Sequence, residues 1–319
     1  MYTVIDLFSG AGGFSLGFKR AGFRIIAAID NSPPVAKTYR YNFPEVVFLE
    51  RDVQEVEGWE LLELVNGRPD VVIASPPCEP FTAANVKRLK DPLDRLYSDP
   101  IGRLTLHAIR LIGDLNPEVF VIENVPQIME GPLKGALKDE LRRVGYSKIY
   151  FNILRAEDYG SPSRRTRVFI SNLRIKPKRL SRRITVMDAI GDLPEPDSEI
   201  PNHEYVPMSP RKYKKAVKLR WGASLIKYSG SSGKLYTNWV KLHPFKPSPP
   251  VLGNSRFIHP FENRLLTVRE HARLMGFPDD HIFLGGRESQ YDMVGEAVPV
   301  PLSYSIACEI ISHLSARNI

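Results

Sequence analysis

Short apolar runs alternate with amphipathic segments along the first half of the chain. The runs have the length and the β-branched content of strands buried on both faces of a sheet. They lie at 2–8, 24–30, 46–49, 70–74, 118–122, 148–154 and 168–171. Between them, helical spacing of apolar residues predicts helices over 14–21, 35–41, 101–115 and 133–144. This alternation predicts an α/β fold built on a doubly wound, Rossmann-like sheet.

The run at 70–74 leads into the segment Ser75-Pro76-Pro77, which is followed by Cys78. Proline can neither continue a strand ladder nor enter a helix interior, so the strand ends here. Ligands of open α/β sheets bind beyond the carboxyl ends of the strands. Cys78 is therefore a candidate nucleophile, and a small buried thiol that merely caps the strand is the structural alternative.

A glycine-rich turn, Ser9 to Gly13, follows the first run, and the second run ends in Asp30. Strand, glycine turn, helix, strand and acid form the first half of a nucleotide-binding sheet, in which the acid accepts hydrogen bonds from the ribose. Ser15 stands where the dinucleotide fingerprint has its third glycine, and no Lys-Ser or Lys-Thr follows the turn. A tight turn without a ligand stays open as an alternative.

Further candidate groups lie at the same edge of the sheet. The run at 118–122 ends in Glu123, and Arg165 and Arg167 precede the last run. In extended backbone these two arginines share one face, opposite Arg164 and Thr166. The alternative is that both arginines are solvent-exposed surface residues without a function. The presence of Cys78 and Glu123 at the same edge favours the functional interpretation.

The chain changes character after residue 172. Segments 174–183 and 211–220 each hold six basic residues in ten, and between 194 and 263 the alternation of strands and helices is lost. Lysine and arginine mixed with aromatic residues favour a nucleic-acid clamp over a solvated, loop-rich insertion. Regular structure returns with the capping box Thr267 to Glu270, a helix over 267–275 and a final helix over 302–314.

These shifts predict two lobes and a joint. We expect a catalytic and cofactor-binding domain at 1–175, completed by 286–319. A small, irregular, basic domain occupies 176–263, and 264–285 forms a hinge and capping helix between the lobes.

Net charge, hydropathy and cysteine content indicate which partners the protein binds and which cellular compartment it occupies. A net charge of +8 and a pI near 9.4 indicate a polyanionic partner. The chain has no apolar run of 18 residues and no signal-peptide pattern, so we expect neither membrane insertion nor secretion. Two distant cysteines fit a reducing cytoplasm, and the histidines lack metal-ligand spacing, so we expect no metal.

Seven segments, in this order, resemble the motifs of the cytosine-C5 DNA methyltransferases. They are DLFSGAGGF (6–14), SPPCEPF (75–81), Asp91-Pro92 with Leu96-Tyr97, Glu123-Asn124-Val125, Arg165 with Arg167, Arg264 to Pro278, and Gly295 to Pro299. The resemblance covers nearly the whole chain except about 195–245, where the family places its variable target-recognition region.

The resemblance implies methyl transfer from S-adenosylmethionine to C5 of a cytosine flipped out of duplex DNA. Cys78 would attack C6, and Glu123 would stabilise charge at N3. Arg167 would hold the base O2, and Arg165 would orient the site or grip a phosphate. The implied cofactor residues are Phe8, Gly10, Ala11, Gly13, Asp30 (ribose), Asp52 (adenine amino group), Val53, Pro76, Leu96 and Glu296.

The chain departs from the family pattern at four positions. Glu79 replaces a glutamine, Thr82 a serine, Ser163 a glutamine and Glu296 an asparagine. An ionised Glu79 beside Cys78 would disfavour the thiolate. These changes bear on rate and affinity more than on reaction class.

Four alternatives define what has to be tested. They are cytosine-C5 methylation of tRNA, amino methylation of a base, a catalytically impaired DNA-binding relative, and a dehydrogenase. Cys78 argues against amino methylation, and nothing in the sequence resembles a hydride-transfer site, which argues against a dehydrogenase.

We expect a monomer that acts on double-stranded DNA in a prokaryotic cytosol, with a cognate restriction endonuclease as a possible partner. The recognised site is not readable from the sequence.

Overall fold

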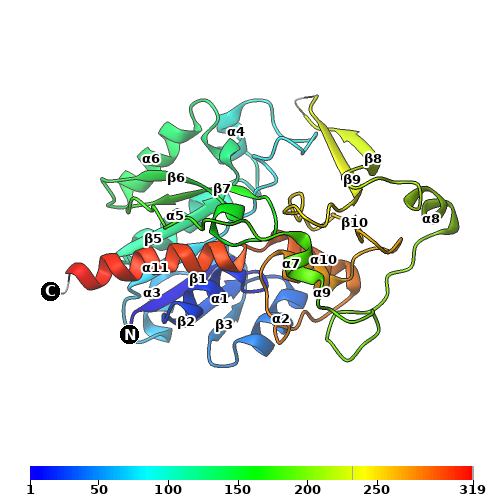
Figure 1. Ribbon diagram of the computed structural model, residues 1–319. Coiled ribbons are helices and arrows are strands. Elements are labelled where there is room, and N and C mark those ends of the chain that lie inside the picture. The colour runs from blue at the N-terminus through cyan, green and yellow to red at the C-terminus, as the bar shows by residue number, and fades with distance from the viewer. Residues whose placement is uncertain (232, 318–319) are drawn as a thin grey trace.

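A seven-stranded sheet forms the centre of the large lobe in the computed structural model, which describes residues 1–231 and 233–317 (Figure 1). Its strands are β1 (Thr3–Leu7), β2 (Arg24–Asp30), β3 (Val47–Glu50), β4 (Val71–Ala74), β5 (Val119–Asn124), β6 (Tyr150–Arg155) and β7 (Thr166–Ser171). They lie in the order β3-β2-β1-β4-β5-β7-β6, and β7 alone runs antiparallel to its neighbours. The predicted α/β doubly wound fold is confirmed.

Helices cover both faces of this sheet because its strands are apolar on both sides. One buried cluster contains residues of α3 (Gly58–Leu64), α4 (Pro92–Tyr97), α5 (Leu104–Leu115) and α6 (Leu133–Arg143). The opposite cluster contains residues of α1 (Gly13–Arg20), α2 (Pro33–Asn42) and α11 (Val300–Arg317). Three short 3₁₀ turns complete the lobe: η1 (Val53–Glu55), η2 (Pro126–Met129) and η3 (Ala156–Tyr159).

Helix α11 closes the large lobe by packing along α1. The Ser303 hydroxyl donates to the Phe14 carbonyl at 2.6 Å, and Gly17 gives the two helices room to approach. The helical stretch Arg287–Arg317 is long and apolar enough to cross a membrane by those two criteria alone. Because 56% of its apolar window is buried inside this molecule, it has the character of a core helix.

The small lobe holds regular structure that the sequence did not predict. A three-stranded sheet, β10-β9-β8, is built from β8 (Ser224–Ser229), β9 (Leu235–Lys241) and β10 (Phe257–Ile258). Two short helices belong to the same lobe: α8 (Pro210–Ala216) contacts β8, and α7 (Val186–Ile190) bonds to the backbone of Pro244 and Lys246. The sequence predicted a small, irregular lobe but not these strands, because β8 is half-buried or exposed along its length and lacks the apolar run of a core strand.

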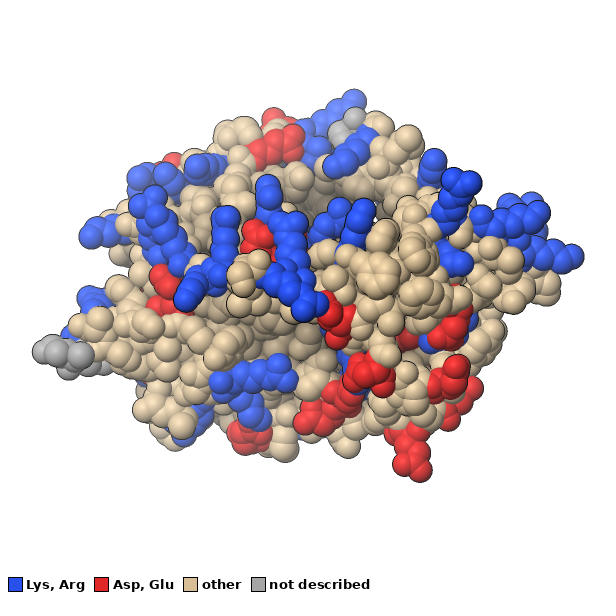
Figure 2. Space-filling view, viewed as in Figure 1, with Lys and Arg blue, Asp and Glu red and all other residues tan. Residues whose placement is uncertain are grey.

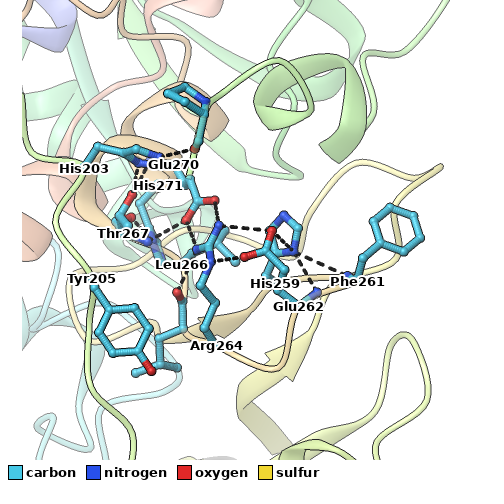
Figure 3. A network of polar contacts seen from close by, with 12 residues as sticks. His203, Tyr205, His259, Phe261, Glu262, Arg264, Leu266, Thr267, Glu270 and His271 are labelled. Carbon is cyan, nitrogen blue, oxygen red and sulfur yellow. Dashed lines mark hydrogen bonds and ion pairs between the residues drawn. The ribbon is translucent and has the colours of Figure 1, made fainter. Parts of the chain in front are cut away.

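A buried polar network links His203 to the segment 259–271 (Figure 3). Arg264 donates two hydrogen bonds to Glu270, both at 2.8 Å, and a further one to Glu262. Glu270 also accepts from the backbone of Thr267, which completes the predicted capping box of α9 (Val268–Leu274). His203 from the small lobe bonds to the Thr267 hydroxyl at 2.8 Å. Helix α10 (Arg287–Glu296), which the sequence did not predict, packs against α9.

Candidate active site

Cys78 lies just beyond the carboxyl end of β4, in a loop that β5 holds in place. The Asn124 side chain donates to the Pro76 carbonyl at 3.1 Å, and the Cys78 carbonyl accepts from the amides of Phe81 and Thr82. These bonds turn the chain sharply and leave the Cys78 side chain half-buried. The thiol is therefore neither packed away in the core nor free on the surface.

Glu123 and Arg167 form a buried ion pair beside this loop. Arg167 Nε lies 2.8 Å from Glu123 Oε1, and the two residues are 9% and 6% exposed. Arg165 is also buried, but it donates to the carbonyls of Val251 and Gly295, both at 2.8 Å. The two arginines thus have separate contacts: Arg167 with the carboxylate of Glu123, and Arg165 with the backbone carbonyls of Val251 and Gly295.

Burial keeps the thiol protonated at neutral pH. Desolvation is the largest influence on Cys78, followed by the attraction of Arg167, and the pKa is raised to about 11. The negative charges of Glu123 and Glu79 act in the same direction as burial, while Arg165 opposes them more weakly. A reaction through the thiolate therefore requires that the proton leave as the substrate engages.

The glycine turn after β1 has the shape of a ligand cradle. Gly10 and Gly12 adopt φ values of +52° and +86°, which L-residues disfavour. A Cβ on Gly10 would meet nothing within 4 Å, so the turn faces open space there. The Gly10 amide donates to the Asp30 carboxylate at 3.0 Å, and burial raises the pKa of Asp30. Phe8, half-buried, also has a positive φ of 60°.

The other predicted cofactor residues lie around the same edge of the sheet. Val53 and Leu96 belong to the buried cluster against which Phe8 and Cys78 pack. Asp52 caps η1 by accepting from the Gln54 amide at 2.9 Å, and Pro76 is buried at the base of the cysteine loop. Asp52 and Pro76 thus follow the carboxyl ends of the parallel strands β3 and β4, at the edge of the sheet where the glycine turn and Cys78 also lie.

The segment Gly295 to Pro299 lies directly against the glycine turn. A Cβ on Gly13 would lie 2.5 Å from the Val298 carbonyl and 3.0 Å from the Ala297 side chain. This contact brings Glu296 to the cofactor side of the site. The pKa of Glu296 is raised to about 7 by desolvation and by the like charges of Glu79, Asp292 and Asp30.

A buried triad beneath the glycine turn was missed by sequence reasoning. Ser15 donates to Asp6 at 2.6 Å and shares a hydrogen bond of 2.7 Å with the Tyr39 hydroxyl. Asp6 is fully buried, and desolvation raises its pKa to about 7. The sequence feature that could have indicated this triad is Ser15 at the third glycine position of the dinucleotide fingerprint, because serine supplies a hydroxyl group and glycine does not.

A basic cavity of about 750 Å³ opens between the lobes. Arg155, Arg164 and Lys246 line it, together with Trp221 and His243. The three cations are exposed, and in the described part of the chain none of them forms an ion pair. Figure 2 shows Lys and Arg side chains gathered around a hollow on the face of the molecule that is turned to the viewer.

The described residues hold no group of three or more histidine, cysteine, aspartate or glutamate side chains placed to bind a metal ion.

Comparison with known proteins places this geometry in a family. A model of the C-5 cytosine-specific DNA methylases matches residues 2–312. M.MJ0563P of Methanocaldococcus jannaschii, provisionally assigned as a type II methyltransferase, is 50% identical over 98% of this chain and all of its own length. The type II methyltransferase M1.HphI of Haemophilus parahaemolyticus is 37% identical over 96% of this chain and 85% of its own length.

Solved structures agree on the fold. A Dnmt2 methyltransferase of S. pombe covers 100% of both chains with a TM-score of 0.67 and 19% identity. A protein from an E. coli prophage, provisionally assigned as a DNA modification methyltransferase, matches with a TM-score of 0.79 and 24% identity over 99% of this chain and 100% of its own. Family model and relatives together confirm the resemblance read from the motifs: the chain belongs to the C-5 cytosine-specific DNA methylase family, whose activity is that of a DNA (cytosine-5-)-methyltransferase.

Proposed function

We propose that this chain methylates C5 of a flipped-out cytosine in duplex DNA through a transient bond between Cys78 and C6. The observation that carries the proposal is the position of Cys78 at the edge of the sheet, within the electrostatic influence of the buried Glu123–Arg167 pair. A thiol that only filled the core would not lie half-exposed beside an ion pair.

Addition of the thiolate to C6 turns C5 into an enamine-like carbon nucleophile. Glu123 holds a proton at N3 and so stabilises the charge that develops in the ring. Arg167 keeps Glu123 in place and reaches the base O2, while Arg165 orients the site by donating to the backbone carbonyls of Val251 and Gly295. Once C5 has taken the methyl group, a water molecule accepts the C5 proton, and the electron pair left behind expels the Cys78 thiolate from C6. N3 returns its proton to Glu123, which releases 5-methylcytosine and restores Cys78.

The family implies S-adenosylmethionine, which supplies an electrophilic methyl group when bound. The residues present fit such a ligand, because Gly10 opens onto free space at the strand end and Asp30 offers an acceptor beside it. We assign contacts to the backbone of Gly10, Ala11 and Gly13 and to Asp30, with Asp52 toward the adenine. The remaining assigned residues are Phe8, Val53, Pro76, Leu96 and Glu296.

Duplex DNA is the proposed substrate, and the basic cavity supports it. Removing a base from the stack costs roughly a few kcal/mol, which contacts with the DNA backbone must offset. Three exposed cations beside Trp221 and His243 offer such contacts with the DNA backbone.

Relatives named as type II methyltransferases come from prokaryotes, which supports a cytoplasmic enzyme that acts beside a restriction endonuclease. We propose that it works as a monomer.

The deciding experiment traps the covalent intermediate. Duplex DNA with 5-fluorocytosine at the methylated position blocks loss of the C5 substituent, so the bond to Cys78 persists and the complex survives denaturing electrophoresis. We expect the adduct with wild-type protein and with Cys308→Ser, and none with Cys78→Ser. Sequencing of methylated positions in DNA from expressing cells identifies the site for the duplex. An adduct formed on tRNA but not on DNA would favour the RNA-modifying alternative.

A catalytically impaired DNA-binding relative is the second candidate. The acids Glu79 and Glu296 favour it, because both stand where the family has amides and Glu79 raises the pKa of Cys78. Wild-type protein that binds DNA and S-adenosylhomocysteine, yet forms no adduct and transfers no methyl group, would establish this alternative.

A further inference from the structure

His281 is buried against the glycine turn, 270 positions away in sequence. Its side chain is 3% exposed, and Nε2 lies 2.9 Å from the Ala11 carbonyl oxygen. A carbonyl only accepts hydrogen bonds, so Nε2 carries the proton and donates. None of the seven motifs that identify the family includes this histidine, which follows the last residue of the Arg264 to Pro278 segment by three positions.

Aromatic rings hold the imidazole in one orientation. The ring centroids of Phe277 and Phe283 lie 4.7 and 5.1 Å from that of His281, and Phe43 meets it edge-on at 6.0 Å. Desolvation in this surrounding lowers the pKa of His281 to about 3. The ring is therefore neutral across the working pH range, and its hydrogen bond to Ala11 does not switch with pH.

The backbone that carries His281 is also fixed. Arg269, fully buried, donates to the His281 carbonyl at 2.8 Å and to the Pro201 carbonyl of the small lobe at 2.9 Å. Asn42 of α2 exchanges two hydrogen bonds with the backbone of Ile282, at 2.7 and 2.9 Å. The imidazole thus projects toward the turn from the backbone of His281 and Ile282, which hydrogen bonds connect to both lobes.

The glycine turn needs such a support because its own backbone is permissive. Ala11 stands between Gly10 and Gly12, both of which adopt positive φ values and have no side chain to restrict them. Asp30 holds the turn on one side, through the Gly10 amide. We propose that His281 is a positioning residue that holds Ala11, and with it the whole turn, in the shape that binds the cofactor. This inference rests on the proposed role of the turn as the S-adenosylmethionine site.

Two substitutions separate the hydrogen bond from the packing. His281→Phe keeps a flat ring among the phenylalanines but removes the donor, which leaves the buried Ala11 carbonyl without its partner. His281→Gln supplies an amide donor at a similar reach. Calorimetric titration with S-adenosylhomocysteine and hydrogen exchange at the amides of residues 9–14 are the readouts, and neither requires turnover.

We expect His281→Phe to raise the Kd for S-adenosylhomocysteine about tenfold and to speed exchange at residues 9–14, since an unsatisfied buried group is costly. His281→Gln should recover most of the affinity. His203→Phe is the matched control: it removes another buried imidazole at the joint, one that contacts Thr267 and Pro194 and not the turn. It should lower the melting temperature without changing the Kd.

Three outcomes decide the matter. Wild-type affinity and exchange in His281→Phe would overturn the inference, as would equal losses in His281→Phe and His203→Phe, which would indicate a general effect of stability. Failure of the wild-type protein to bind S-adenosylhomocysteine at all would instead refute the assignment of the turn as the cofactor site.

Discussion

Asp6 makes the stability of this protein depend on pH in a direction unusual for an acid. Its pKa is raised to about 7 in the folded protein, against about 3.9 in an unfolded chain. The folded state therefore holds the proton more tightly, and the free energy of unfolding falls as pH rises from about 4 to about 7. Three pKa units correspond to about 4 kcal/mol as an upper bound.

Asp6→Asn should remove this dependence, because the amide keeps an acceptor for Ser15 and cannot ionise. Urea unfolding at several pH values between 4 and 8 measures the effect. We expect a flatter profile for the variant and higher stability than wild type above pH 7. The slope that remains belongs to Glu296, whose pKa is also raised to about 7. A slope unchanged by Asp6→Asn would show that Asp6 does not titrate in this range.

Glu79 bears on the reactivity of the nucleophile. Its negative charge contributes to the raised pKa of Cys78, so Glu79→Gln should lower that pKa. The rate of alkylation by iodoacetamide as a function of pH, in a Cys308→Ser background, reports the change. Glu63→Gln, which neutralises an exposed carboxylate on α3, is the matched control and should leave the profile unchanged. Identical profiles for both variants would exclude an electrostatic role for Glu79.

At the scale of elements, the packing of α11 on α1 depends on the absence of a side chain at Gly17. A Cβ there would lie 2.3 Å from the Ser303 hydroxyl and 2.5 Å from the Tyr304 amide nitrogen. Gly17→Ala should therefore destabilise the protein by about 1–3 kcal/mol through overpacking.

Gly135 provides the opposite case. It lies in α6, is exposed, and a Cβ there would meet nothing within 4 Å. Gly135→Ala should therefore stabilise the protein by roughly 0.5–1 kcal/mol, since alanine loses less backbone entropy in a helix. Thermal and urea unfolding of the two variants should shift in opposite directions. Stability in Gly17→Ala equal to or above that of wild type would refute the close contact at Gly17, and a loss of stability in Gly135→Ala would refute the open space at Gly135.

The elements that the sequence predicted well are those whose local pattern is set by burial. β1, β2 and β4 are apolar on both faces, and each ends at a glycine turn, an acid or a proline that marks the boundary. The insertion of β7 between β5 and β6 leaves no such mark, because strand order depends on contacts between distant segments. β8 was missed for a related reason: its side chains are largely exposed, so burial imposed no pattern on them.

Some residues of the candidate site were predictable from local sequence, and others were not. Cys78 and Gly10 follow the carboxyl ends of β4 and β1, and Glu123 and Asp30 lie in the last two residues of β5 and β2. Parallel strands bring their carboxyl ends to one edge of the sheet, so it was predictable that these residues share that edge. The bond from His281 to Ala11 joins segments 270 positions apart and has no local signature. Only the folded joint reveals it.

For the molecule as a whole, the basic cavity predicts how DNA binding responds to salt. Each phosphate that a Lys or Arg neutralises adds about 0.9 to the negative slope of log K against log salt concentration. Arg155, Arg164 and Lys246 line the cavity and are exposed, so their charges are available to a DNA backbone. Replacing all three by glutamine should weaken binding and reduce the slope by about 3.

Arg24→Gln is the matched control for this triple variant. Arg24 is exposed at the start of β2, so it lies at the edge of the sheet opposite Cys78. We expect its slope to equal that of wild type, measured by fluorescence anisotropy from 50 to 300 mM salt with a labelled duplex. Affinity for S-adenosylhomocysteine should be equal in wild type, the triple variant and Arg24→Gln. Equal affinity would show that weaker DNA binding comes from lost phosphate contacts and not from unfolding. If the triple variant and Arg24→Gln lowered the slope equally, the charge that attracts DNA would be spread over the whole surface and the cavity would have no special part in gripping the duplex.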